Sequence, residues 1–192
     1  NHSIFLSYSR LTALECEYGF YKTYLDTNTD KSITFTQANS IGSLVHDALT
    51  NLYLDGNHSL ALDKGIYDDE VVELIDNVLN SSYSKKNSYI VTDFDESVKI
   101  DKLGITLAVK PDLILIDDTA VNIVEYKTFT MKFTMFEQLY IYLYGILNST
   151  SDKYKIIRDA INEKGIVRLI YHFLSEDQIR TEVIYQENFT SF

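Results

Sequence analysis

The sequence predicts a mixed α/β domain over residues 1–192, in which helices flank a β-sheet. Of its 192 residues, 45% are hydrophobic and 23% charged, a composition that supports one folded core. Residues 1–85 show mainly helical spacing of apolar side chains, and residues 86–192 begin with short segments rich in β-branched and aromatic residues. Helical spacing then returns before two last strands, and this order is typical of helices packed around a sheet.

Three helices are predicted in the first part of the chain. The first runs from a Ser9 cap to about Leu25, with apolar residues at spacings of three and four. The second spans about Gln37 to Leu54, and the third follows an Asp68 cap and ends at Asn80. Each carries its apolar side chains on one face, as a helix packed against a core does.

The remaining elements are mostly strands, separated by polar turns. Five short strands are predicted at Tyr89–Phe94, Ser97–Ile100, Gly104–Val109, Leu113–Ile116 and Asn122–Lys127. Two helices are expected at Thr134–Leu147 and Ser151–Lys164, followed by final strands at Ile166–Leu174 and Arg180–Tyr185. Gly165 is the expected stop of the second of these helices.

Several classes of protein are disfavoured by composition. With one cysteine, the chain forms no internal disulfide and no Cys₂ or Cys₄ metal site. No apolar run approaches the roughly 20 residues of a membrane helix, and no secretory leader is visible. We therefore expect an intracellular, cytoplasmic protein without a membrane partner. The net charge of −11 disfavours a broad basic surface for nucleic acid, but it leaves room for a carboxylate metal site.

A polar turn at Asp117–Ala120 joins two predicted strands into a hairpin. If this turn is symmetric about its centre, Leu113 faces Val124 and Asp112 faces Glu125. Facing residues of an antiparallel pair point to the same face, with Cβ atoms roughly 4.5–5.5 Å apart. Two carboxylates placed in this way repel each other unless a cation lies between them.

This pattern of charges suits phosphodiester hydrolysis. Lys127 lies two residues beyond Glu125, and therefore on the same face of the strand. Mg²⁺ takes oxygen ligands, polarises a phosphoryl oxygen and lowers the pKa of water, while a lysine stabilises developing negative charge. The residues alone leave open an ordinary hairpin with solvated charges.

The motifs around this hairpin resemble those of a nuclease family. Lys110-Pro111-Asp112-Leu113, followed by Glu125-Tyr126-Lys127, resembles the signature of the PD-(D/E)XK nuclease superfamily. The segment from Gly42 to His46 resembles the Gly-x-x-x-His helix motif of its RecB-type branch, and Gln138 to Tyr142 resembles the Gln-x-x-x-Tyr motif. Residues 7–25 are similar to the first helix of that branch. The resemblance thus spans residues 7 to about 145.

The resemblance implies a restriction-endonuclease-like core, with a central mixed sheet flanked by helices and an N-terminal helical segment. It also implies Mg²⁺ or Mn²⁺ as cofactor. CRISPR-associated RecB-like exonucleases are similar, but their iron–sulfur cluster needs four thiolates and this chain has only Cys16. No such cluster is therefore expected.

Roles for individual residues follow from the resemblance alone. It makes Asp112, Glu125 and Lys127 catalytic, and it assigns the metal to Asp112, Glu125, His46 and the backbone carbonyl of Tyr126. It assigns the substrate to Gln138, Tyr142 and Lys110. Without it, His46 reads as a surface or satisfied core histidine, Gln138 as surface and Tyr142 as core.

The function implied is a metal-dependent deoxyribonuclease acting on single-stranded DNA or DNA ends, in recombination, repair or replication. The 15 Tyr and 10 Phe residues offer stacking surfaces that suit unpaired bases. A homo-oligomer, or partner proteins of replication or recombination, are further expectations. Two alternatives stay open: a catalytically inactive nuclease fold used for DNA binding or protein assembly, and an acidic calcium-binding or interaction protein.

Overall fold

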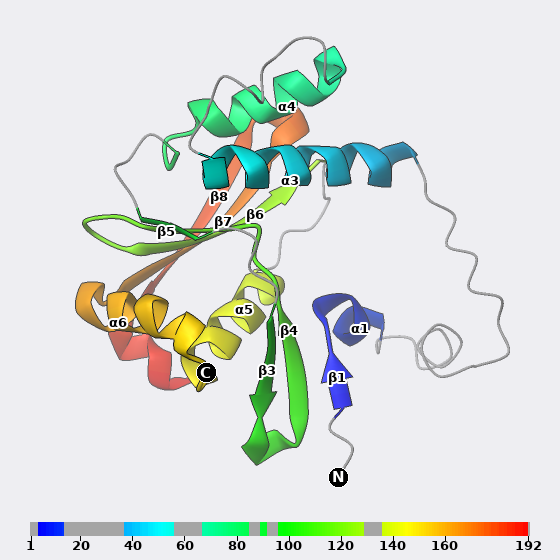
Figure 1. Ribbon diagram of the computed structural model, residues 1–192. Helices are drawn as coiled ribbons and strands as arrows, with labels where there is room; N and C mark the ends of the chain where they lie inside the picture. The colour runs from blue at the N-terminus through cyan, green and yellow to red at the C-terminus, as the bar shows by residue number, and fades with distance from the viewer. Residues whose placement is uncertain are drawn as a thin grey trace, which may run out of the picture.

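The computed structural model describes residues 4–13, 37–55, 67–84, 89–91, 96–128 and 136–191 (Figure 1). Its strands form two mixed sheets flanked by helices, which confirms the predicted mixed α/β class. The helices are α1 (Tyr8–Ala13), α3 (Gln37–Asp55), α4 (Asp69–Asn80), α5 (Glu137–Asn148) and α6 (Lys155–Lys164). The strands are β1 (Ile4–Leu6), β2 (Tyr89–Val91), β3 (Glu96–Ile100), β4 (Ile105–Val109), β5 (Leu113–Ile116), β6 (Val121–Lys127), β7 (Ile166–Phe173) and β8 (Gln178–Tyr185).

The larger sheet has five strands in the order β2-β5-β6-β7-β8. Strands β6 and β7 run parallel, and the other neighbouring pairs are antiparallel. Helices α3 and α4 cover one face of this sheet, while α5 and α6 cover the other (Figure 1). Because both faces are covered, β6 is buried from Val121 to Tyr126, and apolar residues occupy both of its faces.

The smaller sheet has the order β1-β4-β3. Strand β1 runs parallel to β4, with Ile4 paired to Ile105, and it was not expected from the sequence. A three-residue strand is too short to show a period, and its partner lies far along the chain. The strands predicted for one central sheet are therefore divided between two sheets, and α5 packs against both.

Most predicted helices are confirmed where the structure describes them. The predicted helix 37–54 is α3, and Gly165, with a φ of 65°, ends α6 as expected. Asp68 is the N-cap residue of α4, as predicted, although its side chain makes no capping hydrogen bond. Residues 14–25, 92–94 and 134–135 of other predicted elements lie outside the described residues. None of the described helices is long and apolar enough to cross a membrane.

The hairpin of β5 and β6 has the register that its turn predicts. Leu113 pairs with Val124, and Ile116 pairs with Val121. The ladder of β5 begins at Leu113, so Asp112 immediately precedes it and follows the buried Pro111. We call this end, which lies opposite the turn, the open end of the hairpin. It contains the carboxyl end of β6, where the predicted catalytic residues are gathered.

Candidate active site

Four elements bring the candidate residues together. Glu125 and Lys127 lie on one face at the carboxyl end of β6, and Asp112 lies just before β5. Gln138 is the second residue of α5, and His46 lies in the middle of α3. The structure therefore brings together side chains from distant parts of the sequence, as the motifs imply.

A hydrogen-bond network joins β6 to the start of α5. Lys127 Nζ donates to Glu125 Oε1 at 2.7 Å and to Gln138 Oε1 at 3.0 Å. Gln138 Nε2 in turn donates to Glu125 Oε1 and contacts the hydroxyl of Tyr142, both at 2.7 Å. Both Gln138 and Tyr142 are buried. Gln138 therefore fixes the lysine and the glutamate relative to each other, and Tyr142, one helical turn later, orients Gln138.

Asp112 is held by contacts from both sides. The backbone N–H of Tyr126 donates to Asp112 Oδ2 at 2.7 Å, and His46 Nδ1 lies 2.9 Å from Asp112 Oδ1. The imidazole of His46 also meets the ring of Tyr126 edge-on, at 5.9 Å between ring centroids. His46 is thus half-buried at the edge of the site and contacts Asp112 directly.

The position of α3 explains the spacing of its motif. A Cβ atom at Gly42 would lie 3.4 Å from Thr128 Oγ1, so this turn of α3 passes at contact distance from the end of β6. His46 follows four residues later on the same side of the helix, which brings it to Asp112. The approach of α3 to β6 and the His46–Asp112 contact are two consequences of one helix placement.

Glu125 is the electrostatically strained group of the site. Its side chain is 8% exposed, and its Oε2 atom is buried with no hydrogen-bond partner among the described residues. Burial, together with the negative charge of Asp112, raises the pKa of Glu125 well above its ordinary value, and the cation of Lys127 offsets this only in part. Burial would lower the pKa of His46, but the hydrogen bond to Asp112 and the charges of Asp112 and Glu125 raise it.

The donor set fits a hard divalent cation by its chemistry. Two neighbouring carboxylates raise each other's energy, and Glu125 Oε2 is an acceptor that nothing in the described chain satisfies. Both features are relieved by a cation that takes oxygen ligands. As the side chains lie, however, no three histidine, cysteine, aspartate or glutamate groups of the described residues are arranged around a common point. A cation would therefore have to displace present contacts, such as the one between His46 and Asp112.

Other residues singled out from the sequence lie at different distances from this network. Lys110 is exposed between β4 and Asp112. Cys16 lies outside the described residues. Sequence reasoning missed Tyr171 of β7, whose ring centroid lies 5.7 Å from Lys127 Nζ, because the pairing of β6 with β7 is long-range.

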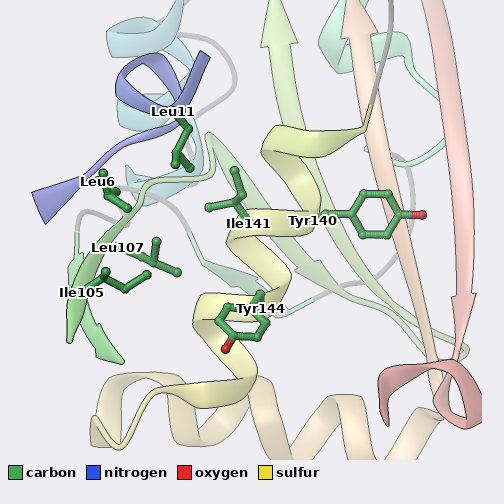
Figure 2. Close-up of a pocket in the computed structure, with 7 residues that line it drawn as sticks. All are labelled: Leu6, Leu11, Ile105, Leu107, Tyr140, Ile141 and Tyr144. Atoms are coloured by element: carbon green, nitrogen blue, oxygen red, sulfur yellow. The ribbon is translucent and has the colours of Figure 1, made fainter. Parts of the chain in front are cut away.

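A cavity of about 320 Å³ lies on another side of α5 (Figure 2). The described residues that line it are apolar or aromatic: Leu6, Leu11, Ile105, Leu107, Tyr140, Ile141 and Tyr144. Figure 2 shows the ring of Tyr140 pointing away from the leucines, and its hydroxyl donates a hydrogen bond to Glu182 of β8. Because the described lining contains no acidic or basic side chain, this cavity offers no general acid, general base or carboxylate metal ligand.

The fold and site together define an α/β protein with two acidic groups and a lysine at the open end of a buried hairpin. A model of the PD-(D/E)XK nuclease superfamily matches residues 6–190. The chain belongs to this superfamily of nucleases, whose members hydrolyse phosphodiester bonds and generally use divalent metals such as Mg²⁺. The two mixed sheets are consistent with its restriction-endonuclease-like fold. No curated protein matches the chain.

Proposed function

We propose that this protein is a metal-dependent deoxyribonuclease that cleaves single-stranded DNA or DNA ends in recombination, repair or replication inside the cell. One observation carries the proposal. Glu125 keeps a buried oxygen without a partner in the described chain, while Lys127 and Gln138 hold its other oxygen beside Asp112. A structural carboxylate would have its acceptors satisfied, whereas a catalytic one must keep an acceptor for what it binds.

Asp112 and Glu125 are the proposed metal ligands, with His46 and the backbone carbonyl of Tyr126 as further donors. When bound there, Mg²⁺ or Mn²⁺ supplies charge neutralisation, polarises the phosphodiester and lowers the pKa of water. Glu125 offers its Oε2 atom without losing a present hydrogen bond. Asp112 offers its Oδ1 atom once His46 turns from hydrogen bonding to metal binding.

Lys127 is the proposed catalytic lysine. Its ammonium donates two of its three hydrogen bonds to Glu125 Oε1 and Gln138 Oε1. The third N–H can donate to the attacking water or to a phosphate oxygen. Gln138 and Tyr142 fix the position of this ammonium and of Glu125 through their shared hydrogen bonds. Lys110, exposed and close in sequence to Asp112, is the proposed contact to substrate phosphate at the rim of the site.

Two observations support single strands or ends over intact duplex. The Gly42–His46 segment resembles a motif of the RecB-type branch, and it lies at the site, since α3 passes at contact distance from the end of β6 and His46 contacts Asp112. The net charge of −11 also weakens nonspecific attraction to the high charge density of duplex DNA.

An inactive binding module is the alternative that the test must separate. Holding a buried carboxylate against its own desolvation and a second negative charge costs folding free energy. A binding module has no use for that cost, whereas a hydrolase recovers it when a cation binds. Glu125 therefore favours the enzyme.

The decisive experiment measures cleavage of matched linear, circular and end-blocked single strands, duplex and RNA, with Mg²⁺, Mn²⁺ or chelator. Protein folding is checked by circular dichroism in each condition. We expect metal-dependent cleavage of single-stranded DNA and its loss with chelator. Binding of DNA without cleavage by folded protein, at any metal concentration, would support the inactive module instead. Cleavage of duplex alone at a defined sequence would contradict the proposed substrate.

A further inference from the structure

A second cation, Arg180, lies on the same face of the sheet as the site. The register aligns Glu125 of β6 with Tyr171 of β7, and Tyr171 with Arg180 of β8. Residues paired directly across neighbouring strands point to the same face of a sheet. Since neighbouring strands lie about 4.7–4.9 Å apart, the backbone of Arg180 lies roughly 9–10 Å from that of Glu125.

Two buried aromatic rings connect Arg180 to the catalytic lysine. The guanidinium of Arg180 lies 5.6 Å from the ring centroid of Phe173, and Lys127 Nζ lies 5.7 Å from that of Tyr171. The two rings are neighbours, with centroids 6.1 Å apart. Each ring is only 3% exposed, so both support cations rather than stack on bases. Lys127, Tyr171, Phe173 and Arg180 thus form a continuous row across three strands.

The surroundings leave this end of β8 suited to an anion. Arg180 is exposed, and Glu182, the next residue of β8 on the same face, is engaged by the hydroxyl of Tyr140. A guanidinium has five N–H donors in a rigid fork, so a phosphate can share it with the contacts that Arg180 already has. Because the chain has a net charge of −11, most of its surface repels a nucleic-acid strand, and a cation beside the site strongly influences where the strand binds.

We infer that Arg180 is a substrate-binding residue that holds a phosphate of the nucleic-acid strand away from the scissile bond. The strand would then run from Lys127 across β7 towards β8. This inference rests on the proposed function, because it extends the same site along the sheet. Arg180 would guide the strand by this contact and take no part in the bond cleavage itself.

The test compares binding of a fluorescent single-stranded oligonucleotide, in chelator and over a range of salt concentrations, between wild type and three variants. Arg180→Gln should bind about tenfold more weakly, since a charge-assisted contact is lost. The slope of log affinity against log salt should fall in magnitude by about 0.7, the contribution of one phosphate contact on a single strand. Arg180→Lys should keep the slope and bind with intermediate affinity, since it keeps the charge but loses the fork.

Lys164→Gln is the matched control. Like Arg180→Gln, it removes one cation. Lys164 lies at the end of α6, close to the start of β7, whereas Arg180 pairs with Tyr171 near the end of β7. The two cations therefore lie towards opposite ends of this strand. We expect the affinity and salt slope of Lys164→Gln to equal those of wild type. In cleavage assays with metal, Arg180→Gln should raise KM about tenfold and change kcat less than twofold, because the contact is remote from the reacting bond.

Three results would overturn the inference. They are an unchanged salt slope in folded Arg180→Gln, an equal loss of affinity in Lys164→Gln, and a fall in kcat with unchanged affinity. Melting temperatures of all three variants show whether a loss of folding is the cause. Because the binding assay needs no turnover, it judges Arg180 even if wild-type protein cleaves nothing, which would contradict the proposed function alone.

Discussion

The two ends of the β5–β6 hairpin each hold a buried acidic side chain, but in opposite surroundings. At the turn, Asp117 Oδ1 accepts hydrogen bonds from the N–H and hydroxyl of Thr119 and from the N–H of Ala120, at 2.7–2.9 Å. Its Oδ2 accepts from Asn122 at 3.1 Å and from Arg168 at 3.2 Å. Burial alone would raise the pKa of Asp117, but these hydrogen bonds hold it well below its usual range.

The open end of the hairpin shows the reverse. Glu125 has Lys127 and Gln138 on one oxygen, while its other oxygen is buried without a partner in the described chain. Burial and the nearby charge of Asp112 raise the pKa of Glu125. Both acids belong to one small element, so the difference lies in the donors around them.

This difference separates a structural acid from a functional one. Asp117 is fully satisfied by the chain itself, and its charge stabilises the turn that sets the register of the hairpin. That register places Glu125 beside Asp112, where Lys127 offsets the negative charge only in part and a bound cation would offset the rest. The turn with Asp117 thus sets the register of the hairpin, and the open end with Glu125 keeps an oxygen that can bind a cation.

The largest expected effect comes from neutralising the open end. Glu125→Gln keeps the shape but removes the charge, so metal-dependent cleavage should fall by a factor on the order of 10³ or more. Without metal at neutral pH, the melting temperature should rise, because the buried Glu125, whose pKa is raised to about 8, must take up a proton on folding at that pH, whereas glutamine is neutral in both states. Cleavage rates and calorimetry on the same preparations measure both effects.

Asp118→Asn is the control for this variant, since it removes one carboxylate from the exposed part of the same hairpin. It should change neither rate nor stability appreciably. If Glu125→Gln kept its rate within tenfold of wild type, Glu125 would be neither a metal ligand nor a catalytic residue.

The next effect concerns the lysine of the open end. Lys127→Met keeps a long unbranched side chain but removes the ammonium beside Tyr171, so kcat should fall by about 10²–10³. Metal binding should persist, because Asp112 and Glu125 are unchanged. Isothermal titration with Mn²⁺ alongside single-turnover cleavage separates the two, and loss of metal binding with unchanged kcat would make Lys127 a structural partner of Glu125.

A smaller effect, on stability alone, is expected at the closed end. Asp117→Asn loses the charge and turns an amide towards groups that donate hydrogen bonds, so unfolding free energy should fall by about 1–3 kcal/mol. The rate per folded molecule should stay unchanged. Urea unfolding and cleavage assays below the transition measure both, and a selective loss of rate would show that the turn contributes to the site directly.

The sequence predicts the open end of the hairpin far better than the closed end. The symmetric turn and the alternation of strand residues set the pairing of Leu113 with Val124, and this register is local. The helical spacing of Gln138 and Tyr142 likewise predicts that they share a face, and they do hydrogen bond. Asp117, by contrast, was expected only as a polar turn residue.

The remaining features depend on contacts between segments far apart in the sequence. The salt bridge of Asp117 requires Arg168 from β7, and the row towards Arg180 requires the pairing of β6, β7 and β8. Neither turn chemistry nor periodicity specifies which strands become neighbours. Strand β1 was missed for the same reason, because its three residues gain their structure only by pairing with β4.

The most direct comparison of the two ends is the pH dependence of stability without divalent metal, an effect spread gradually over several pH units. Asp117 has a lowered pKa when folded, so its stabilisation is present above the unfolded value and is lost as pH falls below about 4. Glu125 has a raised pKa, so wild type should lose stability as pH rises from 4.5 towards about 8. The advantage of wild type over Asp117→Asn should therefore shrink towards acid. The advantage of Glu125→Gln over wild type should grow towards alkaline pH, by at most about 1.4 kcal/mol per pH unit for a single group. Urea unfolding in chelator at several pH values measures both differences. When each is taken as wild type minus variant, the Asp117 difference should rise with pH and the Glu125 difference should fall, and slopes of the same sign would contradict the prediction.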